Sequence, residues 1–314
     1  MDAPTEPPVT PPSLPAPLAA LSGFLMGSAD AVPGVSGGTI ALILGIYDRL
    51  LAALDALVRP PWRWRRAEAV RALAFLAPLL AGLLAAYWLV TRLLVGPTEA
   101  PGWMLRPETA PYCFAFFFGL VLASLPEPWR RIRRPRAMAW WLAAVGAVAA
   151  WVFVGLPHAV GAPATWMLFH GGALAICVML LPGVSGSLLL VILGQYTTIT
   201  SAVHDRQVVP LLVVAAGVVA GLAVFVPLLR RLLVARHDAT MAVLTGLMAG
   251  SLRALWPWKS GYDVKKAALD NVGVATNWPA VLAVAALGMA SVLLLRWVEH
   301  RLQPAPIPGA EEPA

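Results

Sequence analysis

The sequence is 314 residues long, 59% hydrophobic and only 12% charged, with a mean hydropathy of +0.75. Soluble domains keep about a quarter of their residues charged, so this composition excludes a soluble protein and predicts a multi-pass membrane protein. The net charge of +7 is typical of basic loops beside anionic headgroups, and we expect no nucleic-acid partner.

Both ends of the chain are rich in proline and poor in apolar residues. Residues 1–17 are predicted to form a disordered arm, and residues 299–314 a polar tail. Between them lie apolar segments that approach the roughly 20 residues needed to cross a bilayer. We expect six such spans, namely Leu73–Val95, Tyr112–Leu125, Ala137–Leu156, Val208–Leu229, Ala239–Leu255 and Pro279–Val298.

Two further apolar stretches, Leu18–Val58 and Trp166–Val203, are interrupted near their middles by glycine, proline and serine. The apolar run on either side of each break is short for a complete crossing. We therefore interpret each stretch as a re-entrant hairpin whose tip lies inside the membrane, with a kinked full span as the alternative.

Loop charge supports the re-entrant interpretation. If both hairpins return to the side from which they enter, the loops 59–71, 126–136, 230–237 and 296–301 share one side and carry 15 Lys and Arg residues. The loops 96–111, 157–165, 204–207 and 256–278 share the other side and carry five. The positive-inside rule then places the first set, and both termini, in the cytoplasm.

The two breaks repeat each other in sequence. Residues 33–37 and 182–186 both read Pro-Gly-Val-Ser-Gly, and the match continues to Gly45-Ile46-Tyr47 against Gly194-Gln195-Tyr196. Each half consists of one hairpin and three spans. Because three is an odd number of crossings, the second half enters the membrane from the opposite side and is inverted relative to the first. The predicted fold is an all-α polytopic membrane protein with an inverted-topology repeat, as in many secondary transporters. Its units are the first repeat 18–156 (hairpin 18–58), an external linker 157–165 and the second repeat 166–298 (hairpin 166–203).

The chemistry of the breaks suits an anion. Backbone at membrane depth must find partners for its amides, and the start of a helix presents free N–H groups and a positive dipole end. We expect half-helices to begin near Thr39 and Leu188, with glycines that admit a ligand and hydroxyls that bind it. The alternative is a kink for close helix packing. The candidate phosphate-binding residues are Pro33, Gly34, Val35, Ser36, Gly37, Gly38, Thr39, Pro182, Gly183, Val184, Ser185, Gly186 and Ser187.

Ionisable residues inside spans are the next candidates, because hydrocarbon makes them costly. Arg253 lies near the outer end of its span and is a candidate partner for a phosphate, the alternative being that it extends to the outer interface. Asp30 precedes the first break and is a candidate proton relay or ion-pair partner, although a hydrogen-bond acceptor for the first helical turn is the simpler interpretation. We expect no catalytic residues, no metal site and no cofactor, since the sequence has no nucleotide-binding, zinc or nucleophile motif.

Three ordered motifs resemble the polyprenyl-phosphate transporter family. They are Met26–Thr39 with Gly45–Leu50, Leu181–Ser187 with Gly194–Tyr196, and Gly246–Arg253 with Trp256-Pro257-Trp258. The resemblance extends over nearly all of residues 18–298. It implies a non-enzymatic carrier that returns undecaprenyl phosphate from the outer to the inner leaflet of a bacterial cytoplasmic membrane, so that the lipid is reused in peptidoglycan and envelope synthesis.

The resemblance implies that both Pro-Gly-Val-Ser-Gly segments bind the headgroup, with Arg253 as the charge partner. The expected partners are a polyprenyl phosphate and membrane lipid. Two other classes of function stay open from the residues alone. One is a carrier or channel for a small soluble anion, which would have a closed polar pore. The other is a lipid-binding scaffold or membrane enzyme, for which Asp30 is the one acid near the breaks.

Overall fold

The computed structural model describes residues 14–32, 34–59, 65–94, 102–157, 159, 163–262, 271–275 and 277–302. Within these ranges the chain is helical and has no strand, only an isolated bridge between Lys259 and Asn271. Five helical segments are long and apolar enough to cross a membrane: Arg66–Leu94, Ala110–Arg130, Ala137–Val154, Val208–Ala235 and Trp278–Trp297. The protein is therefore a multi-pass α-helical membrane protein.

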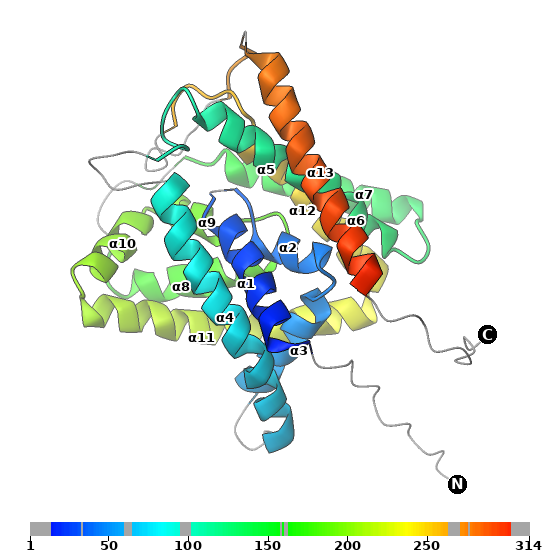
Figure 1. Ribbon diagram of the computed structural model, residues 1–314. Helices are drawn as coiled ribbons and strands as arrows, with labels where there is room; N and C mark the ends of the chain where they lie inside the picture. Colours follow the sequence, from blue (N-terminus) through cyan, green and yellow to red (C-terminus); the bar gives the residue numbers. More distant parts are fainter. Residues whose placement is uncertain are drawn as a thin grey trace.

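The helices occur twice in the same order (Figure 1). The first series is α1 (Ala16–Asp30), α2 (Gly37–Ile43), α3 (Tyr47–Val58), α4 (Arg66–Leu94), α5 (Ala110–Ser124), α6 (Pro126–Arg130) and α7 (Ala137–Val154). The second is α8 (Met167–Leu180), α9 (Gly186–Ile192), α10 (Tyr196–His204), α11 (Val208–Ala235), α12 (His237–Ser251), η2 (Leu252–Leu255) and α13 (Trp278–Leu302).

Each of the six expected spans corresponds to a helical segment, but the bounds differ. Helix α4 begins at Arg66 rather than near Leu73, and α11 continues to Ala235 rather than Leu229, so parts of two expected basic loops are helical. The segment Ala239–Leu255 consists of α12, which has 15 residues, followed by the 3₁₀ turn η2. Its α-helical part is too short to cross the hydrocarbon core alone, because the chain tightens into η2 before the span is complete.

Each expected hairpin contains three helices rather than two. The short helices α2 and α9 both end at a glycine of positive φ, Gly45 at 65° and Gly194 at 67°. The amide of Ile46 donates to the carbonyl of Ala41, and that of Gln195 to the carbonyl of Leu190. This pairing is the Schellman motif, which stops a helix and turns the chain. The turn is sharp, since α9 and α10 are bent by 111°.

Close packing of helix pairs holds the fold together. Helix α1 packs on α4 and α8 on α11, both within one half of the chain. Helix α5 packs on α13 and α7 on α12, so these pairs join the two halves. Glycine allows each approach: a Cβ on Gly23 of α1 would lie 1.8 Å from the Leu79 carbonyl oxygen of α4. Small residues at such contacts are the usual means of packing helices in lipid.

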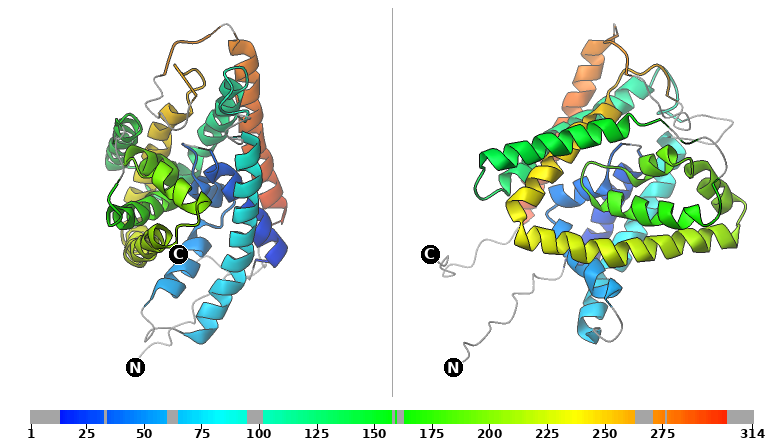
Figure 2. Two further views of the ribbon diagram at one scale, coloured as in Figure 1. Left: turned by 90° about the vertical axis from the view of Figure 1, so that its left-hand side faces the viewer. Right: turned by 180° about the vertical axis from the view of Figure 1, so that it is seen from behind.

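The helices form two layers, seen edge-on in the left view of Figure 2. Helices α4 and α13 lie in one layer, α7, α8 and α11 lie in the other, and the short helix α2 lies between them. All seven residues of α2 are buried, which is consistent with this central position. The two breaks therefore lie in the interior of the molecule.

Candidate functional site

The two breaks meet in the centre of the protein. The Ser36 hydroxyl of the first break donates toward the carbonyl oxygens of Met179 and Leu181, at 3.1 and 3.2 Å. In return, the Gly183 amide of the second break donates to Thr39 Oγ1 at 2.9 Å. Ser36 and Thr39 are completely buried. Segments about 145 residues apart in sequence thus satisfy each other's polar groups, as buried polar groups must.

Serine starts the helix that follows each break. Ser36 is the N-cap of α2 and accepts a hydrogen bond from the Gly38 amide, while Ser185 is the N-cap of α9 and accepts one from the Leu188 amide. This is the favoured role of serine at a helix start. It places the starts at Gly37 and Gly186, two residues earlier than expected. Gly34 and Gly183 have φ values of 94° and 89°, and only glycine adopts these freely.

The other residues of the breaks are buried as well. Val35 and Val184 belong to the apolar interior, and Pro182 is buried beside Gly183. Ser187 is half-buried, and its hydroxyl lies 2.8 Å from the hydroxyl of Ser185. Pro33 lies outside the described residues.

A carboxylate distinguishes the first break from the second. Asp30 Oδ1 accepts a hydrogen bond of 2.7 Å from the Gly37 amide, and its Oδ2 is buried and has no hydrogen-bond partner among the described residues. The simpler interpretation of Asp30, an acceptor for the first helical turn, is therefore confirmed. The second break has Met179 at the matching position. In the described chain, the amides of Gly186 and Ser187 have no hydrogen-bond acceptor.

A cavity of about 500 Å³ adjoins the second break. It lies among α4, α8, α9, α10 and α11, and Gly186 and Ser187 form part of its wall. Most of the remaining lining is apolar, and Tyr87, Tyr196 and Thr200 add hydroxyl groups. The cavity thus borders the segment whose Gly186 and Ser187 amides have no acceptor in the described chain, and the rest of its lining is largely apolar. This combination suits an amphipathic ligand with a small anionic group.

The structure places the Arg253 side chain away from the meeting point of the breaks. Its Nη1 donates to the Trp151 carbonyl near the end of α7 at 2.8 Å, and the guanidinium lies 5.1 Å from the Trp151 ring centroid. The next residue, Ala254, is in contact with the first break, since a Cβ on Gly34 would lie 2.8 Å from the Ala254 Cβ. The backbone of η2 therefore supports the first break, while the Arg253 charge faces the end of α7.

Lys259 is a buried cation, whereas its sequence position suggests only one of the charges of the outer loop 256–278. Its side chain is 6% exposed, with Nζ 3.1 Å from Asn271 Oδ1 and 5.0 Å from the Phe114 ring centroid. Burial, together with the nearby Arg253 charge, lowers the pKa of Lys259 to about 8. Two cations therefore lie near each other on this side. The three neighbouring aromatic residues Trp256, Trp258 and Tyr262 were the only available signal.

Comparison with known proteins gives a consistent result for most of the chain. Residues 26–272 match the family model described as VCA0040-like, undecaprenyl phosphate translocase-like. A polyprenyl-phosphate transporter of Vibrio cholerae is 37% identical over 246 residues, which are 76% of this chain and 77% of the relative. A polyprenyl-phosphate transporter of Staphylococcus aureus is 29% identical over 256 residues, covering 76% of this chain and 85% of the relative. No solved structure matches. The chain belongs to the undecaprenyl phosphate translocase-like family.

Proposed function

We propose that this protein is a secondary carrier that returns undecaprenyl phosphate from the outer to the inner leaflet of the bacterial cytoplasmic membrane. Membership of the family and the printed names of two relatives support polyprenyl phosphate as the substrate. The released carrier lipid would then be available again for peptidoglycan and other envelope polymers. The proposal treats the protein as a transporter and assigns it no catalytic residue.

The observation that carries the proposal is the cavity at the second break. Its apolar wall suits an isoprenoid chain, and the amides of Gly186 and Ser187, beside the Ser185 hydroxyl, suit a phosphate monoester. We infer that the headgroup binds at the breaks while the tail stays in the apolar cavity or in lipid. A small soluble anion would need no apolar surface of this kind.

The proposed transport cycle uses the two breaks in turn. The repeated order of helices supports an inverted-topology repeat, in which the first hairpin opens to the cytoplasm and the second to the outside. The cavity at the second break then faces the outer leaflet. At the first break, the Gly37 amide already donates its hydrogen bond to the Asp30 carboxylate. A phosphate headgroup that binds there therefore has to displace this carboxylate, or bind when Asp30 is protonated.

The proposed first contact of the headgroup is Arg253, with the buried Lys259 adding positive charge nearby. By the positive-inside rule, this end of the molecule lies on the outer, non-cytoplasmic side of the membrane. Guanidinium and ammonium groups at an entrance raise the local concentration of an anionic ligand. Arg253 thus acts as the charge partner of the phosphate before the headgroup reaches the buried serines.

The test is the movement of fluorescent undecaprenyl phosphate between leaflets in proteoliposomes. We expect the wild type to exceed empty liposomes, and Ser36→Ala, Ser185→Ala and Arg253→Ala each to slow transfer at least tenfold. Ser28→Ala is the matched control, since among the described residues Ser28 Oγ bonds only to the Phe24 carbonyl of its own helix. A wild type no faster than empty liposomes refutes the carrier. Unchanged rates in the three variants refute the proposed site alone.

A further inference from the structure

A second, larger cavity lies between helices of the two halves of the chain. Its volume is about 1570 Å³, and it lies among the end of α3, the start of α4 and the last third of α11. Four arginines line it (Arg59, Arg65, Arg230 and Arg231), together with the acids Asp55 and Glu68. This cavity has no role in the transport cycle proposed above.

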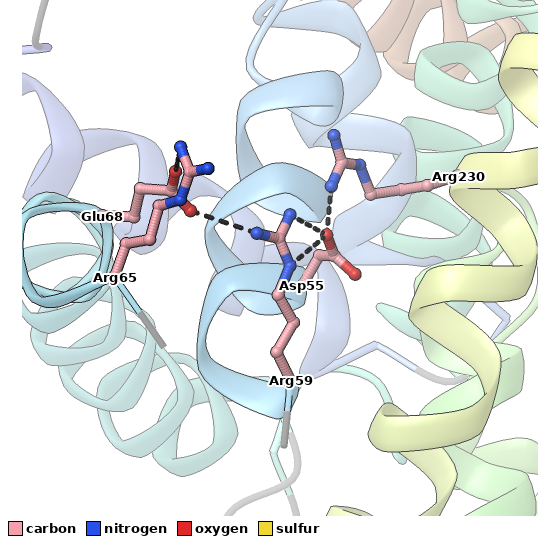
Figure 3. A network of polar contacts seen from close by, with 5 residues as sticks. All are labelled: Asp55, Arg59, Arg65, Glu68 and Arg230. Atoms are coloured by element: carbon pink, nitrogen blue, oxygen red, sulfur yellow. Dashed lines mark hydrogen bonds and ion pairs between the residues drawn. The ribbon is translucent and has the colours of Figure 1, made fainter. Parts of the chain in front are cut away.

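The charged groups converge on one buried carboxylate (Figure 3). Asp55 accepts hydrogen bonds from Arg59 Nε at 3.1 Å and Arg59 Nη2 at 2.7 Å, and it also pairs with Arg230 of α11. Asp55 is 7% exposed. Arg59 Nη1 reaches Glu68 at 3.1 Å, and Arg65 lies 3.6 Å from the same carboxylate. The network joins α3 and α4 of the first half to α11 of the second.

The cavity keeps an excess of positive charge after these pairs are formed. The four guanidinium groups and the two carboxylates that line the cavity have a net charge of +2. A phosphate monoester carries −1.5 to −2 at neutral pH, so one such group would neutralise the balance. Guanidinium is also the group that binds phosphate in a bidentate manner. A purely structural salt-bridge cluster would need no surplus of cations around a cavity.

An apolar surface adjoins the charged part of the cavity. Val224, Leu228 and Val234 of α11 line it, and Val224 and Val234 are 72% and 86% exposed. In a membrane protein an exposed valine in the middle of a spanning helix, such as Val224, faces lipid rather than water. A ligand bound at the arginines could therefore keep an acyl or isoprenoid chain in the bilayer. The combination again favours an anionic lipid headgroup.

We propose that this arginine-lined cavity binds the phosphate monoester headgroup of a lipid on the cytoplasmic side of the membrane. The inference rests on the proposed function, because it assigns to this cavity the receipt of the carried lipid in the inner leaflet. Arg65 and Arg231 supply the charge that Asp55 does not neutralise. The Asp55 carboxylate holds Arg59 and Arg230 in place and competes with phosphate for them.

The experiment measures binding at this cavity in the full chain. Cys113 and Cys177 are first replaced by alanine, and Val234→Cys then carries a fluorophore beside the cavity. The protein in phosphatidylcholine nanodiscs is titrated with undecaprenyl phosphate, with phosphatidic acid and with inorganic phosphate. We expect saturable binding that weakens at least tenfold in Arg65→Gln/Arg231→Gln. Asp55→Asn is expected to bind at least threefold more tightly, which a structural salt bridge alone would not produce.

Arg134→Gln is the matched control, because its exposed side chain lies on the same side but outside the cavity. Binding of the two lipids but not of inorganic phosphate identifies a lipid headgroup site, whereas binding of inorganic phosphate alone overturns the lipid assignment. Equal affinity in wild type and Arg65→Gln/Arg231→Gln also overturns it. Liposome transfer by the wild type is measured separately, so failure of the carrier and failure of this site give different results.

Discussion

At the scale of single residues, the contact between the two breaks depends on a few polar groups. Thr39 is fully buried, and its hydroxyl oxygen accepts the only hydrogen bond found for the Gly183 amide in the described chain. Thr39→Val keeps the shape of the side chain but leaves this amide without an acceptor. We expect a loss of about 1–3 kcal/mol in the free energy of unfolding, the usual cost of an unpaired buried donor.

Thermal unfolding of the detergent-solubilised protein checks this expectation. Thr200→Val is the control, because Thr200 is exposed and, within the described part of the chain, bonds only to carbonyls of its own helix. The Thr39→Val midpoint should fall several degrees below that of the control. Equal midpoints would mean that this contact contributes nothing to the closed arrangement of the breaks.

The sequence predicts part of the site at this scale and misses another part. Residue type and position suffice for the acceptor role of Asp30, because this is a local interaction of a few residues. The sequence predicts the helix caps Ser36 and Ser185 only as ligand-binding hydroxyls, with each helix starting two residues later. The direction of the Arg253 side chain depends on the Trp151 carbonyl, 102 residues away. The burial of Lys259 likewise depends on Phe114 and Asn271. Such contacts are set by the fold and have no signal in a short motif.

At the scale of helices, the apolar segments and the repeated breaks are readable from sequence, whereas the pairing of helices is not. Composition locates α4 and α11 but misses their basic ends, because Arg66–Arg71 and Arg230–Ala235 continue the helices beyond the apolar run. The glycines of each break mark where the backbone turns. Nothing in the sequence of α5 or α7 indicates that each packs on a helix of the other half, α13 and α12. The partner is chosen by surface shape over several turns, which single-sequence patterns do not encode.

The glycine contacts between helices give a prediction at this scale. In Gly23→Ala the new Cβ would lie 1.8 Å from the Leu79 carbonyl oxygen and 2.9 Å from the Leu79 Cα, so α1 and α4 must separate. Alanine favours an isolated helix by about 1 kcal/mol, yet we expect a net loss of about 1–3 kcal/mol from overpacking. Gly261→Ala is the control, because a Cβ there would meet nothing within 4 Å.

The unfolding temperatures of the two alanine variants test whether Gly23 is needed for close packing of α1 on α4. A lower midpoint for Gly23→Ala, with Gly261→Ala unchanged, supports close packing as the role of this glycine. If Gly23→Ala is as stable as the wild type, the α1–α4 pair tolerates separation and is not a fixed part of the scaffold.

At the scale of the whole molecule, the charges and the two cavities suggest one path. The smaller cavity adjoins the second break, and the larger one is lined by arginines of the segments 59–71 and 230–237. The positive-inside rule places those segments in the cytoplasm. In the proposed orientation, the two cavities would open toward opposite leaflets. Alternating access requires an arrangement of this kind.

Orientation is therefore the property on which the transport proposal depends, and cysteine accessibility tests it. With Cys113 and Cys177 replaced by alanine, we introduce Arg134→Cys, Asp205→Cys or Gly261→Cys and treat intact cells with a membrane-impermeant maleimide. Asp205, between α10 and α11, and Gly261, after η2, should react from outside. Arg134, before α7, should react only after the cells are opened.

The position of Asp205 is the sharpest of the three, because it separates the two readings of the second apolar stretch. If residues 166–203 return to the outer side, Asp205 lies on the opposite side of the membrane from Arg134, since α7 alone crosses between them. If that stretch crosses the membrane completely, Asp205 lies on the opposite side from the start of α8, and basic segments lie on both sides. Labelling of Arg134→Cys from outside together with protection of Asp205→Cys would reverse the assigned orientation and with it the direction of each cavity.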